Sequence, residues 1–263
     1  MSTPVCLSAP STRFTRSQIP RVLALCLIAA VPAQAGFVTW SSPKTITGDS
    51  DISNLGAFVS AYNLGAAGNA SATVNGVTFD PFATNATTNT VGNVTLSSSA
   101  TISGSNSDFG ETLPPFSLLS PGYKTLLQSG SFTTGTFPPP TISMTLNGLT
   151  PGAEYQFQWW AHESEASSFA PAPPLPATSA TAGNSVTLQR RGVLPGSLGQ
   201  FALGVFIATS ASQVIDFNGS DSKTLLSAFQ LRQIAAPVPE PGTALFGLAM
   251  AGVAFRSVSK RRR

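Results

Sequence analysis

The stretch Ala72-Thr73-Val74-Asn75-Gly76-Val77-Thr78-Phe79 decides the fold class. It places Asn-Gly between two short β-prone runs, which is the strongest short-range signal for a β-hairpin. Asn and Gly tolerate the positive φ angles that a two-residue turn of this kind requires. The sequence therefore predicts two antiparallel strands joined at residues 75–76.

Side chains that alternate between apolar and polar predict further strands along the chain. Their apolar members are Ile142, Met144 and Leu146; Phe201, Leu203, Val205 and Ile207; Ile215 and Phe217; and Phe229 and Leu231. Gly, Ser, Thr, Asn and Pro separate these runs, and no window keeps a helical period with caps. Residues 36–234 are therefore expected to form one all-β domain, a β-sandwich or jelly roll, in which the Pro- and Ala-rich segment 164–183 is a long loop.

The end of the chain has three parts: Val238-Pro239-Glu240-Pro241, the apolar run 243–255, and a terminus with Arg261, Arg262 and Arg263. The prolines fix φ and lack an N–H group, so this segment is expected to stay extended. As a helix the apolar run would rise about 20 Å, less than the ~30 Å of a hydrocarbon core. The terminal cations are expected on the cytoplasmic side. An ordinary single-pass anchor is the alternative.

This order of segments resembles the PEP-CTERM sorting tail of Gram-negative bacteria. The resemblance covers about the last 27 residues of the chain. It implies that residues 235–263 form a sorting tail with a short transmembrane segment and a processing motif. It makes an exosortase the processing partner and the inner membrane a transient one. The expected destination after processing is the cell surface or the extracellular exopolysaccharide matrix.

The beginning of the chain predicts export as well. Three arginines (Arg13, Arg16 and Arg21) precede the apolar run 22–31, which Ala33-Gln34-Ala35 follows. This is the layout of a signal peptide with an A-x-A cleavage site. Residues 1–35 are therefore expected to be removed, with Gly36 as the first residue of the mature chain. Both cysteines lie in the signal peptide, so the mature domain has no disulfide or cysteine metal site.

Charge is distributed unevenly between the ends and the body. Residues 36–234 have six basic and ten acidic residues, a net charge of −4, although the whole chain carries +3. The excess of positive charge thus belongs to the two terminal segments. Since the body has no basic patch to neutralise phosphates, we expect no nucleic-acid partner.

The body also has a resemblance of its own. Five segments look like segments that recur in exported proteins with this tail, namely 47–52, 61–65, 74–79, 146–155 and 227–232. Those domains are similar to galactose-binding-like β-sandwiches, and such modules often hold a structural Ca²⁺ ion. The segment Leu149-Thr150-Pro151-Gly152 followed by Tyr155 is also fibronectin-III-like, with a tyrosine that packs at a corner.

The best candidate binding surface is the predicted strand 155–162. Side chains alternate between the two faces of a strand, so one face carries Tyr155, Phe157, Trp159 and Ala161 and is expected to meet the core. The other face carries Gln156, Gln158, Trp160 and His162. Amides with an indole suit a carbohydrate, because they offer hydrogen bonds and an apolar ring face. The alternative is that Trp160 is covered by the 164–183 loop or by another strand. His162 is the only histidine of the chain, so it cannot build a zinc site.

Asp49 and Asp51 are the candidate metal ligands. Two carboxylates with loop carbonyls suit a structural Ca²⁺ ion. The alternative is a turn in which the aspartates bond their own backbone.

An enzymatic function is not expected. A glycoside hydrolase would need two carboxylates across a cleft, for which Glu163 or Glu165 with Asp216 or Asp221 are the candidates. Nothing in the sequence positions such a pair, and no G-x-S-x-G elbow occurs. We therefore expect an exported surface or matrix protein with a non-catalytic sandwich that binds carbohydrate. The alternatives are a purely structural component without a ligand, or a secreted hydrolase.

Overall fold

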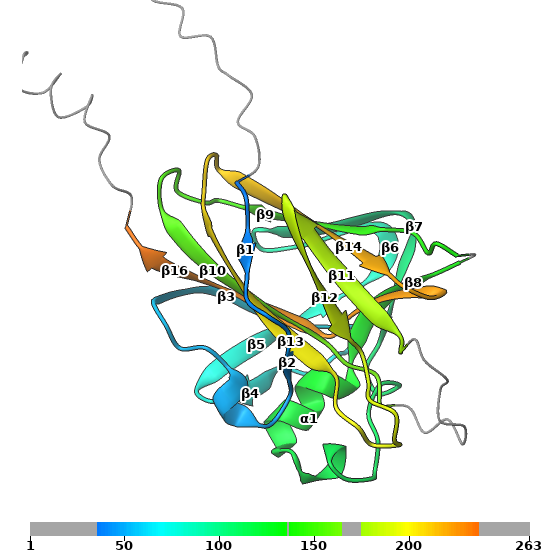
Figure 1. Ribbon diagram of the computed structural model, residues 1–263. Coiled ribbons are helices and arrows are strands. Elements are labelled where there is room, and N and C mark those ends of the chain that lie inside the picture. Colours follow the sequence, from blue (N-terminus) through cyan, green and yellow to red (C-terminus); the bar gives the residue numbers. More distant parts are fainter. Residues whose placement is uncertain (1–35, 136, 165–174, 237–263) are drawn as a thin grey trace, which may run out of the picture. The chain divides into compact units, whose positions relative to one another are not determined.

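The computed structural model describes residues 36–135, 137–164 and 175–236 (Figure 1). The expected signal peptide, Glu165 and the expected sorting tail from residue 237 onward lie outside the described residues. Within the described residues, two eight-stranded sheets and a single α-helix confirm the predicted all-β sandwich. The galactose-binding-like type of sandwich stays a prediction. Among the described residues no helix is long and apolar enough to cross a membrane.

The strands divide equally between the two sheets. The first sheet contains β1 (Thr39–Trp40), β2 (Lys44–Thr45), β3 (Ala57–Gly65), β4 (Ala72–Val74), β5 (Val77–Ala83), β10 (Glu154–Ala161), β13 (Gln200–Ile207) and β16 (Ala228–Ala235). The second sheet contains β6 (Asn85–Val91), β7 (Val94–Ser105), β8 (Gly130–Thr134), β9 (Ile142–Asn147), β11 (Ala177–Ala182), β12 (Asn184–Gln189), β14 (Ser212–Gly219) and β15 (Lys223–Leu226). Three helices complete the fold: η1 (Asp49–Asp51), η2 (Phe116–Leu118) and α1 (Pro121–Gln128).

The chain crosses between the sheets at buried polar corners. Between β5 and β6, the Thr84 N–H donates to the carbonyl of Gly65 at 2.8 Å, and its hydroxyl bonds that of Ser131 at 2.8 Å. Between β15 and β16, the Ser227 N–H donates to the carbonyl of Trp160 at 3.0 Å. These bonds satisfy backbone and hydroxyl groups that a buried corner would otherwise leave unpaired.

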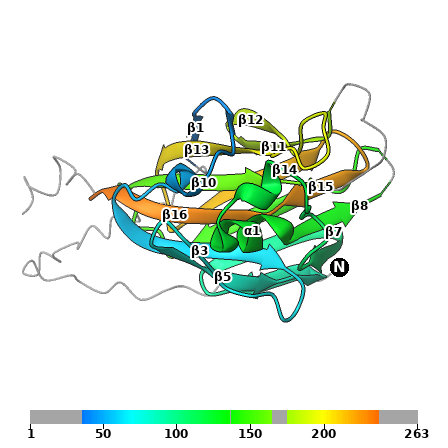
Figure 2. The ribbon, with the colours of Figure 1, turned by 90° about the horizontal axis from the view of Figure 1, so that it is seen from below.

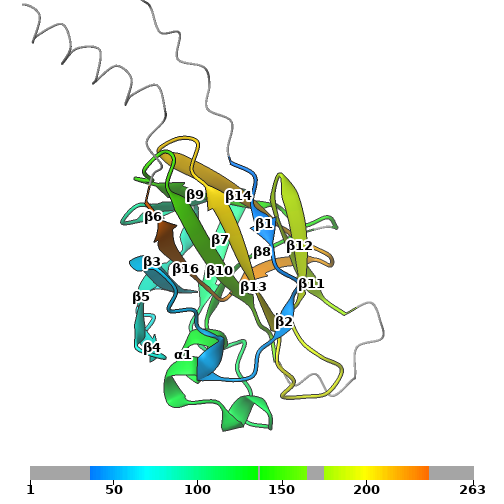
Figure 3. The same cartoon turned by 60° about the vertical axis from the view of Figure 1, so that its left-hand side comes forward.

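The first described residues close one side of the sandwich. Strand β1 pairs with β13 of the first sheet, while Val38 bridges to Gly183 between β11 and β12 of the second. Figure 3 shows β1 running between β13 and the β11–β12 hairpin. The segment that is expected to begin the mature chain is thus part of the folded domain.

The core between the sheets comes from the inward positions of facing strands. Tyr155, Phe157, Trp159 and Ala161 of β10 all belong to it, as predicted. Opposite them lie Ile142, Met144 and Leu146 of β9. The indole of Trp159 meets the ring of Phe217 edge-on at 5.0 Å. Period-two alternation therefore identified this face of both strands correctly.

Two local motifs also form as predicted. Strands β4 and β5 pair antiparallel through Val74 and Val77, with Asn75 at φ 48° and Gly76 at φ 75°. Both values lie in the left-handed region that a type I′ turn requires. At the other motif, the Thr150 N–H donates to the Tyr155 hydroxyl oxygen at 2.9 Å, which makes the corner expected of that tyrosine.

The row on β13 from Phe201 to Ile207 shares one face of a strand, as predicted. This is the outer face, with Ile207 57% exposed, while Ala202 and Phe206 face the core. Two other expectations about elements are wrong. The expected loop 164–183 contains β11, which pairs with β12 and β14. A helix exists where none was expected: Ser120 caps α1 by accepting the N–H of Tyr123 at 3.2 Å, and Pro121 stands in its first turn.

Helix α1 and the β4–β5 hairpin build a second hydrophobic cluster on the outer face of the first sheet. Its main members are Phe79, Tyr123, Leu126, Trp160 and Phe201. Figure 2 shows α1 over β16 and β3 in a view onto this face. One part of the first sheet is therefore buried on both faces, and the predicted binding row of β10 lies in this part.

Candidate functional site

The row predicted to bind carbohydrate is buried. Gln158, Trp160 and His162 have no exposed surface, and Gln156 is 8% exposed. The four residues lie together on the outer side of β10, as the period of two predicts, but other parts of the chain cover them. The expectation of an open binding surface here is wrong, and the alternative that Trp160 is covered is correct.

Trp160 is held by the second hydrophobic cluster. Its indole N–H donates to the Tyr123 hydroxyl at 3.0 Å. The ring of Phe79 meets it edge-on at 5.7 Å, and that of Phe201 stacks at 6.2 Å. A buried indole with its donor satisfied is a packing residue. Among the described residues, α1 and β5 supply this cover.

The glutamines of the row bond the segment that lies over them: Gln158 bonds its main chain and Gln156 bonds a side chain. The Gln158 amide donates to the carbonyl of Asp51 at 2.7 Å, and its oxygen accepts the N–H of Ser53 at 3.0 Å. The Ser53 hydroxyl donates to Gln156, and Gln230 on β16 donates to Gln158 at 2.6 Å. This ladder of amides fastens segment 51–53 to the sheet, so these side chains have a structural role.

His162 lies at the end of the row, enclosed by two loops. Its Nδ1 accepts the N–H of Gly199 at 3.1 Å, and its ring stacks on Phe116 at 5.1 Å. Burial lowers the pKa of His162 to about 3, because the charged form would lose its hydration. The imidazole is therefore neutral in the folded protein at ordinary pH.

The two aspartates proposed for Ca²⁺ are acceptors within the chain. Both oxygens of Asp51 accept from Thr47, at 2.7 Å each, and one also accepts from the N–H of Gly48 at 3.0 Å. Asp49 accepts from the hydroxyl of the α1 cap, Ser120, at 2.6 Å. Asp51 therefore matches the turn alternative, because its partners Thr47 and Gly48 belong to the same turn, whereas Asp49 bonds a distant segment. The Ca²⁺ site stays a prediction. Among the described residues no three of His, Cys, Asp and Glu gather where they could hold a metal ion.

The carboxylates considered for hydrolysis are committed to other contacts. Buried Glu163 contacts Arg190 at 3.1 Å and Lys223 at 2.5 Å, and Asp221 also pairs with Arg190. Asp216 on β14 accepts from the hydroxyl of Ser143 at 2.6 Å. The structure thus brings Glu163 and Asp221 to a shared arginine, where both carboxylates neutralise cations.

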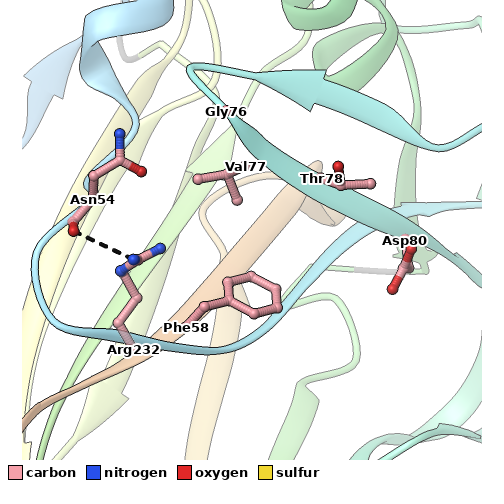
Figure 4. Close-up of a pocket in the computed structure, with 7 residues that line it drawn as sticks. All are labelled: Asn54, Phe58, Gly76, Val77, Thr78, Asp80 and Arg232. Atoms are coloured by element: carbon pink, nitrogen blue, oxygen red, sulfur yellow. Dashed lines mark hydrogen bonds between the residues drawn. The ribbon is translucent and has the colours of Figure 1, made fainter.

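A surface pocket remains that the sequence did not indicate (Figure 4). It has a volume of about 350 Å³ and is lined by Asn54, Phe58, Gly76, Val77, Thr78, Asp80 and Arg232. Figure 4 shows Asn54 and Arg232 on one side of the Phe58 ring and Asp80 on the other. Phe58 is 52% exposed, an uncommon state for a large aromatic ring within a sheet.

The two charges of this pocket are held differently. Arg232 donates to the carbonyls of Leu55 at 2.8 Å and Gly56 at 2.9 Å, and its guanidinium lies 5.9 Å from the centre of the Phe58 ring. Asp80 has no ion pair among the described residues. Burial, and then the charge of Asp80, raise the pKa of the neighbouring Tyr62.

Part of this pocket had a sequence signal. Thr78 alternates with the apolar Val77 and Phe79 in the predicted hairpin, and Asp80 continues this alternation one residue beyond it, so their outward position could have been read from the sequence. The contribution of Arg232 had no such signal, because it reaches the site through the pairing of β16 with β3.

Comparisons with known proteins do not assign the body, residues 36–234, to a family. One solved structure is 17% identical in sequence to this chain, with a TM-score of 0.16. The alignment covers 74% of this chain and 99% of the chain in that structure. Its title describes the structural basis for the promiscuous specificity of carbohydrate-binding modules from the β-sandwich superfamily. A likeness of this degree carries no argument about the pocket. No curated protein matches the sequence.

The tail gives a definite result. Residues 237–263 match the family model of the PEP-CTERM protein-sorting motif. Such a motif implies an exported protein of a Gram-negative bacterium that is sorted through an exosortase. The match includes the Pro-Glu-Pro segment and the three terminal arginines named above. The chain therefore ends in a PEP-CTERM sorting motif.

Proposed function

We propose that the chain is an exported protein displayed at the cell surface or in the exopolysaccharide matrix, where its sandwich binds carbohydrate without catalysis. The sorting motif at residues 237–263 is the observation that carries this proposal. It supports export and processing, while the body supplies whatever the protein does at its destination. The expected exosortase cut near Pro239-Glu240-Pro241 would free the folded domain from the membrane segment.

The contacts of the acidic residues support a non-catalytic body. Glu163 and Asp221 serve as counter-ions to Arg190, and Asp216 accepts from a neighbouring strand. Acid–base hydrolysis needs carboxylates that reach a substrate and change protonation there.

One observation favours a second candidate, a purely structural component of the surface or matrix. The residues predicted to bind carbohydrate, Gln156, Gln158, Trp160 and His162, are all buried. If the exposed surface offers no site for sugar, the protein would contribute only bulk and folding stability to the matrix.

Two measurements in the producing bacterium test the proposal. The first compares the wild-type chain with Glu240→Ala combined with deletion of residues 261–263, by following mass and location in fractionated cells. We expect the wild type to lose its tail and reach the surface or matrix, and the variant to stay unprocessed in the inner membrane. Equal processing of both chains would contradict the sorting part. A deletion in the 165–174 segment serves as the control, because it leaves the tail intact.

The second measurement is the retention of the full-length chain in native gels that contain exopolysaccharide purified from the same bacterium. Retardation relative to a gel without polysaccharide is expected. Equal mobility in both gels would refute carbohydrate binding and leave the structural candidate.

A further inference from the structure

We propose that the pocket between β3 and β5 is a binding site for one neutral sugar unit of a polysaccharide. This inference rests on the proposed function and gives it a location, which differs from the row that the sequence suggested. Four features carry it: a fork between two strands, an exposed aromatic ring, an unpaired carboxylate and an arginine fixed by main-chain carbonyls.

The hollow exists because β3 and β5 pair over only part of their length. Their parallel register begins at Tyr62 and Asp80. Before that point Phe58 pairs with Arg232 of β16, while Val77 pairs with Val74 of β4. The two strands therefore diverge like a fork, and the pocket of about 350 Å³ lies between its arms. This volume is within the usual range for small-molecule sites.

The floor and wall of the fork are apolar. Val77 is buried and belongs to the second hydrophobic cluster, while Phe58 is an exposed residue. A sugar ring has an apolar face of C–H groups, which can cover an exposed aromatic ring and remove it from water. A single ring in a shallow pocket suits one sugar unit rather than a long apolar ligand.

Polar groups stand at both ends of the Phe58 ring. The Asp80 carboxylate is free to accept from sugar hydroxyls, and hydrogen bonds to a charged acceptor are the strong ones. The side-chain amide of Asn54 donates to the carbonyl of Asn75 at 3.2 Å, which holds it at the rim. The Thr78 hydroxyl bonds Thr73 at 3.1 Å and keeps capacity for a second partner.

Arg232 makes the site rigid before any ligand arrives. Three carbonyls, those of Asn54, Leu55 and Gly56, accept from its Nε and Nη2 atoms. These bonds fasten loop 54–56 to β16 and fix the guanidinium beside the Phe58 ring, at 8% exposure of the residue. A preorganised site loses less entropy on binding.

The charges favour a neutral sugar over an acidic one. Asp80 presents its negative charge to solvent, whereas Arg232 is mostly buried and its charge is shared among carbonyl dipoles. The body as a whole carries −4 over residues 36–234. A uronic acid would meet repulsion from Asp80 without a free cation to pair with.

The test uses the full-length chain, kept in solution with a polyoxyethylene detergent that contains no sugar. Saturation-transfer NMR is recorded with the methyl glycosides of glucose, galactose and mannose and with methyl glucuronide. The same chains are run in gels that contain the exopolysaccharide. The variants are Phe58→Ala and Asp80→Asn. The matched controls are Phe37→Ala and Asp108→Asn, since both residues are exposed and lie outside the pocket.

We expect saturation of at least one neutral glycoside, strongest at its ring C–H protons, and none of the glucuronide. Phe58→Ala and Asp80→Asn should each weaken binding about tenfold, the size of one lost ring contact or charged hydrogen bond. Both controls should bind like the wild type. Equal melting temperatures of all five chains exclude unfolding as the cause.

Failure of this inference is distinguishable from failure of the proposed function. If the wild type is retarded by exopolysaccharide and both pocket variants are retarded equally, the pocket is not the site, although carbohydrate binding stands. If the wild type shows neither saturation nor retardation, both the pocket and carbohydrate binding are overturned. Preference for the glucuronide would overturn the assignment of a neutral sugar.

Discussion

The single histidine predicts how the folded domain responds to acid. His162 is fully buried, accepts the N–H of Gly199 through Nδ1, and stacks on Phe116. Its pKa falls to about 3 in the folded protein, because burial penalises the imidazolium. In the unfolded chain the same group has its ordinary pKa of about 6.5. Between these two values the unfolded chain binds a proton that the folded protein does not.

The sign and size of the effect follow from this difference. Because the folded-state pKa is the lower one, the stabilisation is complete above pH 6.5 and is lost as the pH falls toward 3. From pH 7.5 to pH 5.0 the expected loss is about 2 kcal/mol in the free energy of unfolding. With an m-value of about 2 kcal/mol/M, the urea midpoint should fall by about 1 M. Few carboxylates titrate in this interval, so the histidine dominates it.

The assay is urea unfolding of residues 36–236 at both pH values, followed by tryptophan fluorescence. This segment contains both sheets and both hydrophobic clusters. His162→Asn is the matched variant, because its amide oxygen can still accept from Gly199 but does not titrate. It should be less stable than the wild type at pH 7.5 and lose far less on acidification. An equal loss in wild type and variant would refute the argument.

Three further predictions concern the cover of the first sheet and the ion-pair cluster. Trp160→Ala should cost about 3–5 kcal/mol of unfolding free energy in urea, because it leaves a cavity under α1; a loss below about 1 kcal/mol would mean that Trp160 is not packed as described. Asp51→Ala should lower the free energy of unfolding by about 1–3 kcal/mol, because the hydrogen bonds to Thr47 and Gly48 are lost. Millimolar Ca²⁺ should leave the melting temperature of the wild type unchanged, whereas a rise would support the calcium site. Glu163→Gln should cost about 1–3 kcal/mol, because the buried Arg190 would keep Asp221 but lose the charge of its second carboxylate partner. An unchanged denaturation midpoint would contradict this.

Local patterns predicted the local elements well. The Asn75-Gly76 turn, the corner at Tyr155 and the inward face of β10 depend on neighbours in sequence, and all three are confirmed. The helix α1 also has a local signal in the sequence. Ser120-Pro121 is a typical cap and first residue, and Tyr123, Leu126 and Leu127 have helical spacing.

The second face of β10 could not be predicted in the same way. A period of two separates Trp160 from Trp159, but it does not say whether the second face meets solvent or another layer. The layer that covers it comes from segments far away in sequence, α1 and the β4–β5 hairpin. The row of Gln156 and Gln158 looked like a binding surface because alternate glutamines on a strand have the same sequence pattern in two cases. They can hold a loop of the same chain, as here, or bind a ligand.

The contrast between tail and body has a physical basis. A processing enzyme binds an extended peptide, so its recognition signal lies in consecutive residues of the chain. The order of Pro239-Glu240-Pro241, apolar run and basic end is therefore visible in the sequence without the fold. The pocket of the body is assembled by pairing β3 with both β5 and β16, which brings Phe58, Asp80 and Arg232 together over more than 150 residues of chain. Such a site has no linear signature, and it becomes visible only when the strands are in register. It follows that sorting of this protein can be read from its last residues, whereas the binding site that we propose at the fork between β3 and β5 could not be read from the sequence.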